Sequence, residues 1–524
     1  MKIVKDLNLG FSDAINYLQR GNKELFSSVF VKNEYLDELK KTNVYYLIGE
    51  KGTGKTAYAA YCNNNETDSD KAFLKYICNT DYEKFYELKK QKRIDVSGYA
   101  DVWKVILLLL MAQFVTDNKK VIAPLNKSNL PQIMKAIDEY YNRAFSPEIE
   151  NALRIVDKSG LMAKLVCQYA ETGGQLEATE EFTEQKLQMN LYYIFQHFSE
   201  YLGKLKLQKN VILFVDGIDV RPSQIPYDDY LECIKGLSQA CWALNTELFC
   251  NVRDSRGQFR IVLLLRPDIF NSLNLQNATN KLADNSVYLE WRTTYADYRN
   301  SSLYRVAAKL LSYEQNKEVV NDIWEYYFPW RLDSSNKSER DYDTAFMAFL
   351  KISLSRPRDI QRIMSLIKNA MKRRGLSDAA VFDYDSFLSD QFQNEYSEYF
   401  LGSLKDQLSF YYSDEDYQHF KKFFDFFSKP SFTYKEYEEK YNKYTDYIIA
   451  NAKEIPKFVE DKREFLQLLY DSNIIAVKDS KGYFHFSYRE KSPTNISPKV
   501  MYGDDVTYMF HYGLYKKAGM GRYV

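Results

Sequence analysis

The sequence predicts an α/β domain built on a parallel sheet flanked by helices, followed by a helical bundle and a small C-terminal domain. Three observations support this prediction. The stretch G-E-K-G-T-G-K-T at 49–56 stands directly after the apolar run 44–48 and before helix-forming residues. Two more segments of strand length, 211–215 and 260–265, are almost wholly apolar, as is typical of parallel strands buried on both faces. The last third of the chain reads first as helices and then as a helix with a hairpin.

The segment 49–56 has the spacing G-x-x-x-x-G-K-T of a phosphate-binding loop, and it lies between a predicted strand and a predicted helix. Glycines in such a loop let backbone N–H groups approach a triphosphate closely. We expect Lys55 to reach the β- and γ-phosphates and the Thr56 hydroxyl to bind Mg²⁺. No N/T-K-x-D base-reading motif follows the strands, so ATP is the expected nucleotide. The predicted ATP site consists of Gly49, Glu50, Lys51, Gly52, Thr53, Gly54, Lys55 and Thr56.

Asp216 ends the predicted strand at 211–215. A carboxylate at the end of a neighbouring buried strand is expected to face the metal ion held by Thr56, because ligands bind at the carboxyl ends of parallel strands. The alternative is a turn residue with no ligand. Thr56 and Asp216 are therefore the predicted Mg²⁺ ligands.

Hydrolysis also requires a group that orients the attacking water. Many enzymes with this pair of motifs carry Glu directly after the metal-binding Asp, but here that position is Gly217. Asp219 is the nearest carboxylate that could serve, and its alternative role is to cap a helix or turn. Glu50 within the loop is a second candidate. The glycine favours slow hydrolysis.

Two arginines are candidates for contacting the transferring phosphoryl group. Arg266 follows the strand 260–265, where it could touch the γ-phosphate; the alternative is an ion pair at a strand end. Arg358, close to Arg356, begins a helix of the predicted bundle and could couple that bundle to the nucleotide. The alternative for Arg358 is a solvated basic helix. An arginine acting on a neighbouring subunit could be Arg253, Arg256 or Arg292.

The predicted organisation has three parts. A nucleotide-binding domain covers 1–297 and includes a helical insertion at about 82–206. A helical lid bundle covers 298–404, and 405–524 holds a helical segment and a winged helix. The winged helix is predicted from a helix at 465–470 and strands at 474–477 and 483–486, joined by the turn 479–482. The wing could bind a protein, or its basic residues could contact nucleic-acid phosphates. These residues are Lys478, Lys481, Arg489 and Lys491.

The amino-acid composition limits the binding partners and the cellular location that we expect. Lys+Arg and Asp+Glu number 71 each, so no global field draws the 524-residue chain to nucleic acid or to an anionic membrane. The six cysteines lack C-x-x-C spacing, which favours a reducing cytoplasm without a zinc site. The longest uncharged apolar stretch, 105–115, is shorter than the ~20 residues of a membrane span, and we expect a buried helix there. A cytoplasmic protein without a membrane partner is the prediction.

The order of these features resembles that of the AAA+/STAND-like P-loop ATPases of bacteria, including KAP-type NTPases and relatives from antiphage defence loci. The features are the loop at 49–56, the strand that ends at Asp216, the strand that ends at Arg266, the helix start at Arg358 and the C-terminal winged helix. By this resemblance Arg266 and Arg358 are the two sensor arginines of the family. The resemblance also implies a nucleotide-driven conformational switch that assembles with itself or with a partner effector.

Two functions follow from these patterns. The leading hypothesis is an ATP-binding and ATP-hydrolysing switch that acts with a partner effector in antiphage defence or nucleic-acid surveillance. The alternative is a winged-helix regulator that binds nucleic acid and uses the nucleotide structurally or hydrolyses it slowly.

Overall fold

The computed structural model describes residues 1–77, 96–124, 198–315, 322–332 and 344–516, and a few isolated positions besides (131, 192, 195–196 and 518–519). The chain divides into two compact units. The sheet unit comprises Tyr35–Ile48 and Thr56–Val287. The C-terminal unit comprises Met1–Glu34, Gly49–Lys55 and Tyr288–Val524. The predicted domain boundaries at residues 297 and 404 stay predictions.

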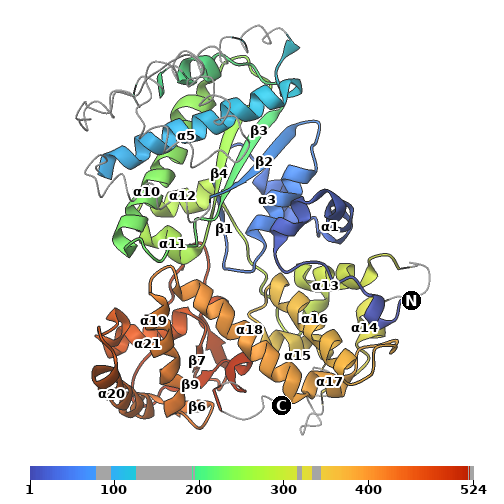
Figure 1. The fold of residues 1–524 in the computed structure, drawn as a ribbon, viewed down its shortest axis with the longest axis vertical. Coiled ribbons are helices and arrows are strands. Elements are labelled where there is room, and N and C mark those ends of the chain that lie inside the picture. Colours follow the sequence, from blue (N-terminus) through green and yellow to red (C-terminus); the bar gives the residue numbers. More distant parts are fainter. Residues whose placement is uncertain are drawn as a thin grey trace, which may run out of the picture. The chain divides into compact units, whose positions relative to one another are not determined.

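The sheet unit is built on a five-stranded parallel sheet, as predicted (Figure 1). Strand order is β2-β3-β4-β1-β5, so β4 lies between β1 and β3. The strand that carries Asp216 is therefore not the neighbour of the strand before the loop, contrary to expectation. The strands are β1 (Tyr46–Ile48), β2 (Asp70–Tyr76), β3 (Asn210–Asp216), β4 (Phe259–Leu265) and β5 (Ser286–Tyr288).

Helices flank these strands because the strands are apolar on both faces: β3 is buried from Val211 onward and β4 over its whole length (Figure 1). Two of the flanking helices, α5 (Val96–Asp117) and α10 (Tyr227–Ala243), pack together. The Trp103 indole N–H of α5 donates to the Cys233 carbonyl of α10 at 3.1 Å. The others are α2 (Glu34–Leu39), α3 (Lys55–Asn64), α11 (Pro267–Ser272) and α12 (Ala278–Asn285).

The predicted buried helix at 105–115 is part of α5. Among the helices that the structure describes, the segment Gly98–Asp117 is long and apolar enough to cross a membrane by length and composition. Most of it, however, is buried inside the protein. The rest of the predicted insertion at 82–206 lies mainly outside the described residues.

The C-terminal unit begins with short N-terminal helices that pack on a helical bundle. The bundle core is aromatic: Trp324 stacks on Phe328 and meets Phe346 and Phe349 edge-on. The elements that the structure describes within 298–404 are helices, and their role as a lid stays a prediction. The helices are α1 (Lys23–Val29), α13 (Ser302–Ser312), α14 (Ile323–Tyr327), α15 (Ala345–Ile352), α16 (Pro357–Arg373), α17 (Tyr384–Leu388) and α18 (Asp390–Leu408).

Past α18 the unit contains a four-stranded antiparallel sheet in the order β6-β9-β7-β8. The predicted helix and hairpin correspond to α21, β7 and β8, and the Gly482 N–H donates to the Asp479 carbonyl in the hairpin turn. Sequence analysis missed β6 and β9, which are short and pair across a long separation, Ser431 with Met509. The elements are α19 (Asp414–Lys422), β6 (Ser431–Thr433), α20 (Tyr434–Asn451), α21 (Lys462–Asp471), β7 (Ile475–Lys478), β8 (Phe484–Phe486), α22 (Ser487–Glu490) and β9 (Thr507–Phe510).

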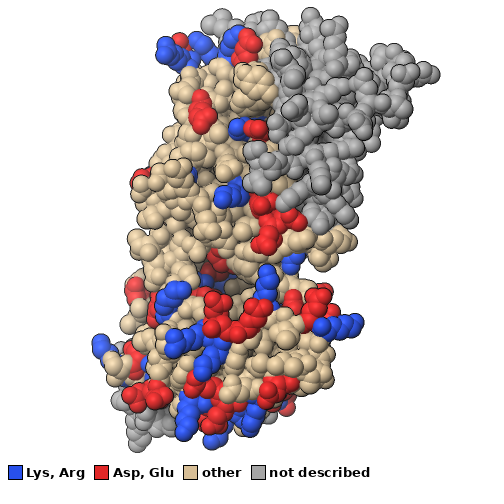
Figure 2. All heavy atoms as spheres, turned by 90° about the vertical axis from the view of Figure 1, so that its left-hand side faces the viewer, with Lys and Arg blue, Asp and Glu red and all other residues tan. Residues whose placement is uncertain are grey.

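The charged surface agrees with the balanced composition. On the face drawn in Figure 2, acidic and basic side chains of the described residues are interspersed. Such mixing favours specific local contacts over long-range electrostatic attraction.

Candidate functional site

The loop 49–54 connects β1 to α3, which begins at Lys55. Gly52 and Gly54 have φ values of +88° and +98°, in the left-handed region that favours glycine. The Thr53 hydroxyl donates to the Glu50 carbonyl at 2.8 Å. The Lys55 ammonium is buried and donates to the Gly49 carbonyl at 2.8 Å and to the Glu50 carbonyl at 3.4 Å. The lysine expected to contact phosphate therefore lies against the loop's own backbone.

The two predicted Mg²⁺ ligands are in direct contact in the sheet unit. The Thr56 hydroxyl donates to Asp216 Oδ2 at 2.6 Å, and the Gly217 N–H donates to Asp216 Oδ1 at 2.8 Å. Asp216 is buried. A hydroxyl and a carboxylate are hard oxygen donors, and Mg²⁺ usually takes one or two protein oxygens together with waters and substrate phosphates. The donor set of this pair, which we call the metal corner, thus fits Mg²⁺.

The structure explains why an acidic residue does not follow Asp216. Gly217 has a φ of +89°, and a Cβ atom placed there would lie 2.2 Å from the carbonyl oxygen of Ile77. The Ile77 N–H donates to the Asp216 carbonyl at 2.9 Å, which holds the Ile77 backbone beside the end of β3. Asp219 lies half-buried in the turn after β3, and its role in orienting water stays a prediction.

Arg266 forms the ion pair that the sequence left open as the alternative. Its side chain is fully buried, and its guanidinium pairs with both carboxylate oxygens of Asp268, with Nε at 3.0 Å from Oδ1. Arg266 precedes α11, which Pro267 begins. A role of Arg266 in sensing phosphate stays a prediction.

Residues of the helical bundle also contact the loop. We call the contacted part of the loop, which consists of Glu50, Lys51 and Gly52, its docking face. Arg356 Nη1 donates to the Lys51 carbonyl at 2.7 Å, and the Lys51 ammonium lies 2.8 Å from an Asp406 carboxylate oxygen. The Arg358 backbone N–H points to the Gly52 carbonyl at 3.5 Å.

The Arg358 backbone N–H faces the loop, whereas the Nε of its guanidinium donates to the Ser12 carbonyl at 3.2 Å. In this arrangement Arg356 is the arginine whose guanidinium contacts the loop. The coupling role predicted for the Arg358 side chain stays a prediction.

Arg356 is fixed by a buried ion pair. Its Nε and Nη2 lie 2.9 and 3.0 Å from the two carboxylate oxygens of Asp359. Burial opposes charge on both groups, but their mutual attraction outweighs it: the pKa of Arg356 is raised and the pKa of Asp359 is lowered. Asp359 also accepts from the Tyr399 hydroxyl at 2.7 Å and from the Leu354 N–H at 3.0 Å.

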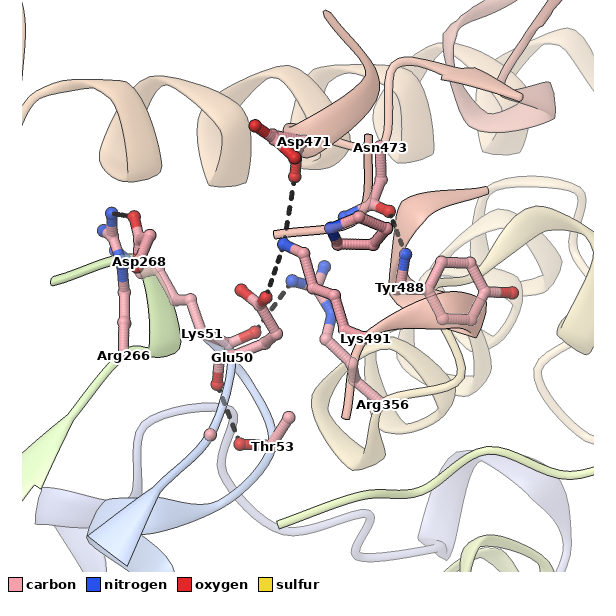
Figure 3. A network of polar contacts seen from close by, with 12 residues as sticks. Glu50, Lys51, Thr53, Arg266, Asp268, Arg356, Asp471, Asn473, Tyr488 and Lys491 are labelled. Atoms are coloured by element: carbon pink, nitrogen blue, oxygen red, sulfur yellow. Dashed lines mark hydrogen bonds and ion pairs between the residues drawn. The ribbon is translucent and has the colours of Figure 1, made fainter. Parts of the chain in front are cut away.

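A lysine from the C-terminal sheet region also contacts the docking face, at Glu50. The Lys491 ammonium lies 2.8 Å from Glu50 Oε1 and donates to the Asp471 carbonyl at 3.2 Å, as Figure 3 shows. The side chains of Lys491 and Glu50 are only 7% and 19% exposed. Burial raises the pKa of the Asp471 carboxyl to about 6, although the charge of Lys491 acts to lower it.

This placement changes the interpretation of the basic residues in the predicted wing. Lys491 is buried on Glu50, and the half-buried Arg489 guanidinium lies over the rings of Tyr488 and Tyr295. Of the four, Lys478 and Lys481 are the exposed ones.

The three candidates for an arginine acting on a neighbouring subunit differ in their surroundings. Arg292 pairs with Glu290 and donates to the Arg489 carbonyl, so it is engaged within the chain. Arg253 and Arg256 are exposed in the segment before β4, at the amino end of that strand.

Sequence reasoning missed the roles of Arg356, Asp359, Asp471 and Lys491. The first two lie beside Arg358 in the motif S-R-P-R-D, but nothing in the sequence joins Lys491 to the loop.

Comparison with known proteins adds no named counterpart for this site. No model of a protein family matches the chain, and no curated protein matches its sequence.

Proposed function

We propose that the chain is an ATP-binding and ATP-hydrolysing conformational switch. The observation that carries the proposal is the 2.6 Å hydrogen bond between Thr56 and Asp216, which joins two motifs 160 residues apart. The sequence predicted that Asp216 faces the metal ion held by Thr56, and a nucleotide site requires the two residues together. Oxygen ligands and a neighbouring lysine suit a magnesium-bound triphosphate.

The residues would divide the chemistry in a simple way. Bound Mg²⁺ would neutralise phosphate charge and make the γ-phosphorus open to attack by water. Thr56 and Asp216 would hold the ion, and Lys55 would exchange its two backbone carbonyl partners for phosphate oxygens. Asp219 is the leading candidate for orienting water, with Glu50 second. Because the residue that follows Asp216 is Gly217 and carries no carboxylate, slow turnover is expected.

A slow nucleotide cycle suits a switch better than a motor. The resemblance to AAA+/STAND-like ATPases supports a role in antiphage defence or nucleic-acid surveillance, carried out with a partner effector or by self-assembly. The contacts of the loop with Arg356 and Lys491 provide routes by which a change in the loop would reach the rest of the C-terminal unit.

The substitution Lys55→Ala tests the proposal. It removes the cation that offsets phosphate charge, so ATP binding in a calorimetric titration should fall below detection while the circular-dichroism melting curve stays close to wild type. Lys40→Ala, at an exposed lysine, should bind ATP like wild type. Unchanged ATP affinity in Lys55→Ala would reject a nucleotide site at this loop.

Asp216→Ala tests the metal corner. Removing the carboxylate should abolish Mg²⁺-dependent phosphate release, a loss of about 100-fold or more, since charge stabilisation dominates phosphoryl transfer. A malachite-green assay with and without Mg²⁺ measures it. Turnover at the wild-type rate would place the metal ion elsewhere.

A second candidate function is nucleic-acid binding by the antiparallel sheet region. It is favoured by the β7–β8 hairpin, which presents the exposed Lys478, Lys481 and Tyr483, the last 68% exposed. Binding of labelled DNA or RNA should then weaken steeply with added salt and weaken further in a Lys478→Ala/Lys481→Ala variant. Association that ignores salt would instead indicate a protein-binding surface.

A further inference from the structure

Glu50 is the residue at which two sets of contacts on the loop meet. Its backbone carbonyl accepts hydrogen bonds from Lys55 Nζ at 3.4 Å and from the Thr53 hydroxyl at 2.8 Å. Its side-chain carboxylate pairs with the Lys491 ammonium at 2.8 Å (Figure 3). One residue thus connects the lysine expected to bind phosphate with a lysine that follows it by more than 400 positions in the chain.

The position of Lys491 is fixed by its own surroundings. It directly follows α22, and its N–H donates to the Ser487 carbonyl. The Tyr488 N–H donates to the Asn473 side chain at 2.7 Å, which ties α22 to the end of α21. Because the Lys491 ammonium is buried, loss of Glu50 as a partner carries a substantial cost, and the pair holds the docking face where it is.

Binding of a triphosphate would disturb this arrangement. Phosphate oxygens would compete with the Gly49 and Glu50 carbonyls for the Lys55 ammonium, so the backbone of Glu50 would lose a hydrogen bond and shift. The ion pair with Lys491 resists such a shift. A pocket lined by Glu50, Thr53, Trp291, Asn473 and Lys491 borders the pair and gives the Glu50 side chain space to move.

We propose that Lys491 and Glu50 form an inhibitory latch that opposes nucleotide binding, and that ATP and the latch weaken each other. This inference rests on the proposed nucleotide-binding function. Coupling between two sites is reciprocal: the factor by which the latch weakens ATP binding equals the factor by which ATP weakens the latch. Lys491 is a positioning residue here, since it acts on the nucleotide only through Glu50.

Opening the latch from either side should therefore tighten ATP binding. Lys491→Met keeps most of the length of the side chain and removes the charge, and Glu50→Gln keeps the shape of the partner. Each variant should bind ATP about fivefold more tightly or better, and the double variant should add little to either. Lys481→Met, at an exposed wing lysine, should leave ATP affinity unchanged.

Amide hydrogen exchange at residues 487–491 gives a readout from the other end of the latch. Exchange there should be faster in both single variants than in wild type, and adding ATP to wild type should speed it as well. Melting curves show whether Lys491→Met is folded. If it is not, the proposal is tested by the ATP affinity and amide exchange of Glu50→Gln and by the amide exchange of wild type with ATP.

The outcomes separate the two proposals. A wild-type chain that does not bind ATP rejects the proposed function and the latch with it. A wild-type chain that binds ATP, while the folded variants show unchanged or weaker affinity, rejects the latch alone. Exchange at 487–491 that ignores both ATP and the substitutions leads to the same conclusion.

Discussion

The metal corner and the docking face of the loop are stabilised in different ways. At the metal corner, Asp216 ends a buried parallel strand and Thr56 lies in the first turn of a helix, so both side chains are placed by regular backbone structure. The docking face instead depends on individual side chains: Arg356 from the bundle and Lys491 from the C-terminal sheet region.

Under the proposed function, this difference suits the metal corner to holding Mg²⁺ and the docking face to control. A site built on strand and helix ends keeps its geometry, as metal binding requires. In a buried ion pair, removal of one side chain leaves the other charge buried without its partner. Loss of either residue therefore disrupts the whole contact. Substitutions should therefore have distinct effects in the two regions.

The largest effect on stability is expected at the Arg356–Asp359 pair. Asp359→Ala would leave a buried guanidinium without its partner and should lower the free energy of unfolding by about 3–5 kcal/mol. Urea denaturation followed by circular dichroism measures the change. Asp378→Ala removes an exposed partner of Lys5, so little or no loss of stability is expected. Equal effects of the two substitutions would mean that burial adds nothing to the Arg356–Asp359 pair.

A smaller effect is expected at the metal corner, where backbone shape matters most. Gly217→Ala places a Cβ against the Ile77 carbonyl at positive φ and should destabilise the protein by about 1–3 kcal/mol. Gly217→Glu, which restores the acid common in similar enzymes, should lower stability too and fail to raise the ATPase rate. Gly203→Ala in a helix, where the added methyl has room, should be neutral or slightly stabilising.

A stable Gly217→Glu variant with faster hydrolysis would show that the strand end adapts. In that case the slow turnover expected of this chain would reflect the missing carboxylate and not the fixed backbone.

The same contrast explains what could be predicted from the sequence. Strands β3 and β4 and the loop follow from local patterns, an apolar run or a glycine spacing, and the predicted residues Thr56 and Asp216 are found in contact. The pairing of Lys491 with Glu50 depends on how distant segments pack. No local pattern encodes that packing, and Lys491 looked like any other basic residue of a wing. Strands β6 and β9 escaped prediction for the same reason, since three or four residues become a strand only beside a distant partner.

The smallest effect, and the most specific to the docking face, concerns the pH dependence of stability at Asp471. Burial raises the pKa of its carboxyl from about 3.8 to about 6 in the folded chain, against the charges of Lys491 and Lys499, while Glu50 acts in the same direction as burial. Between pH 4 and 6 the folded state thus holds a proton that the unfolded state has released. Stability therefore falls as pH rises through this window, and above pH 6 the cost is complete.

Asp471→Asn removes this cost while keeping the backbone carbonyl that accepts from Lys491. The unfolding free energy of the variant relative to wild type should thus improve by on the order of 1 kcal/mol between pH 4 and pH 7, less than a fully buried carboxyl would give, because the residue is partly exposed. Urea unfolding of both proteins across this range measures the difference.

Asp479→Asn provides a control of opposite sign. Burial acts to raise the pKa of Asp479, but the Tyr483 N–H and His485 outweigh it and hold that pKa below its ordinary value. The variant should lose stability relative to wild type as pH rises through the acidic range, because only the ionised carboxylate is favoured by the fold. If both substitutions gave the same trend, the pH dependence would report general charge and not the burial of Asp471 behind Lys491.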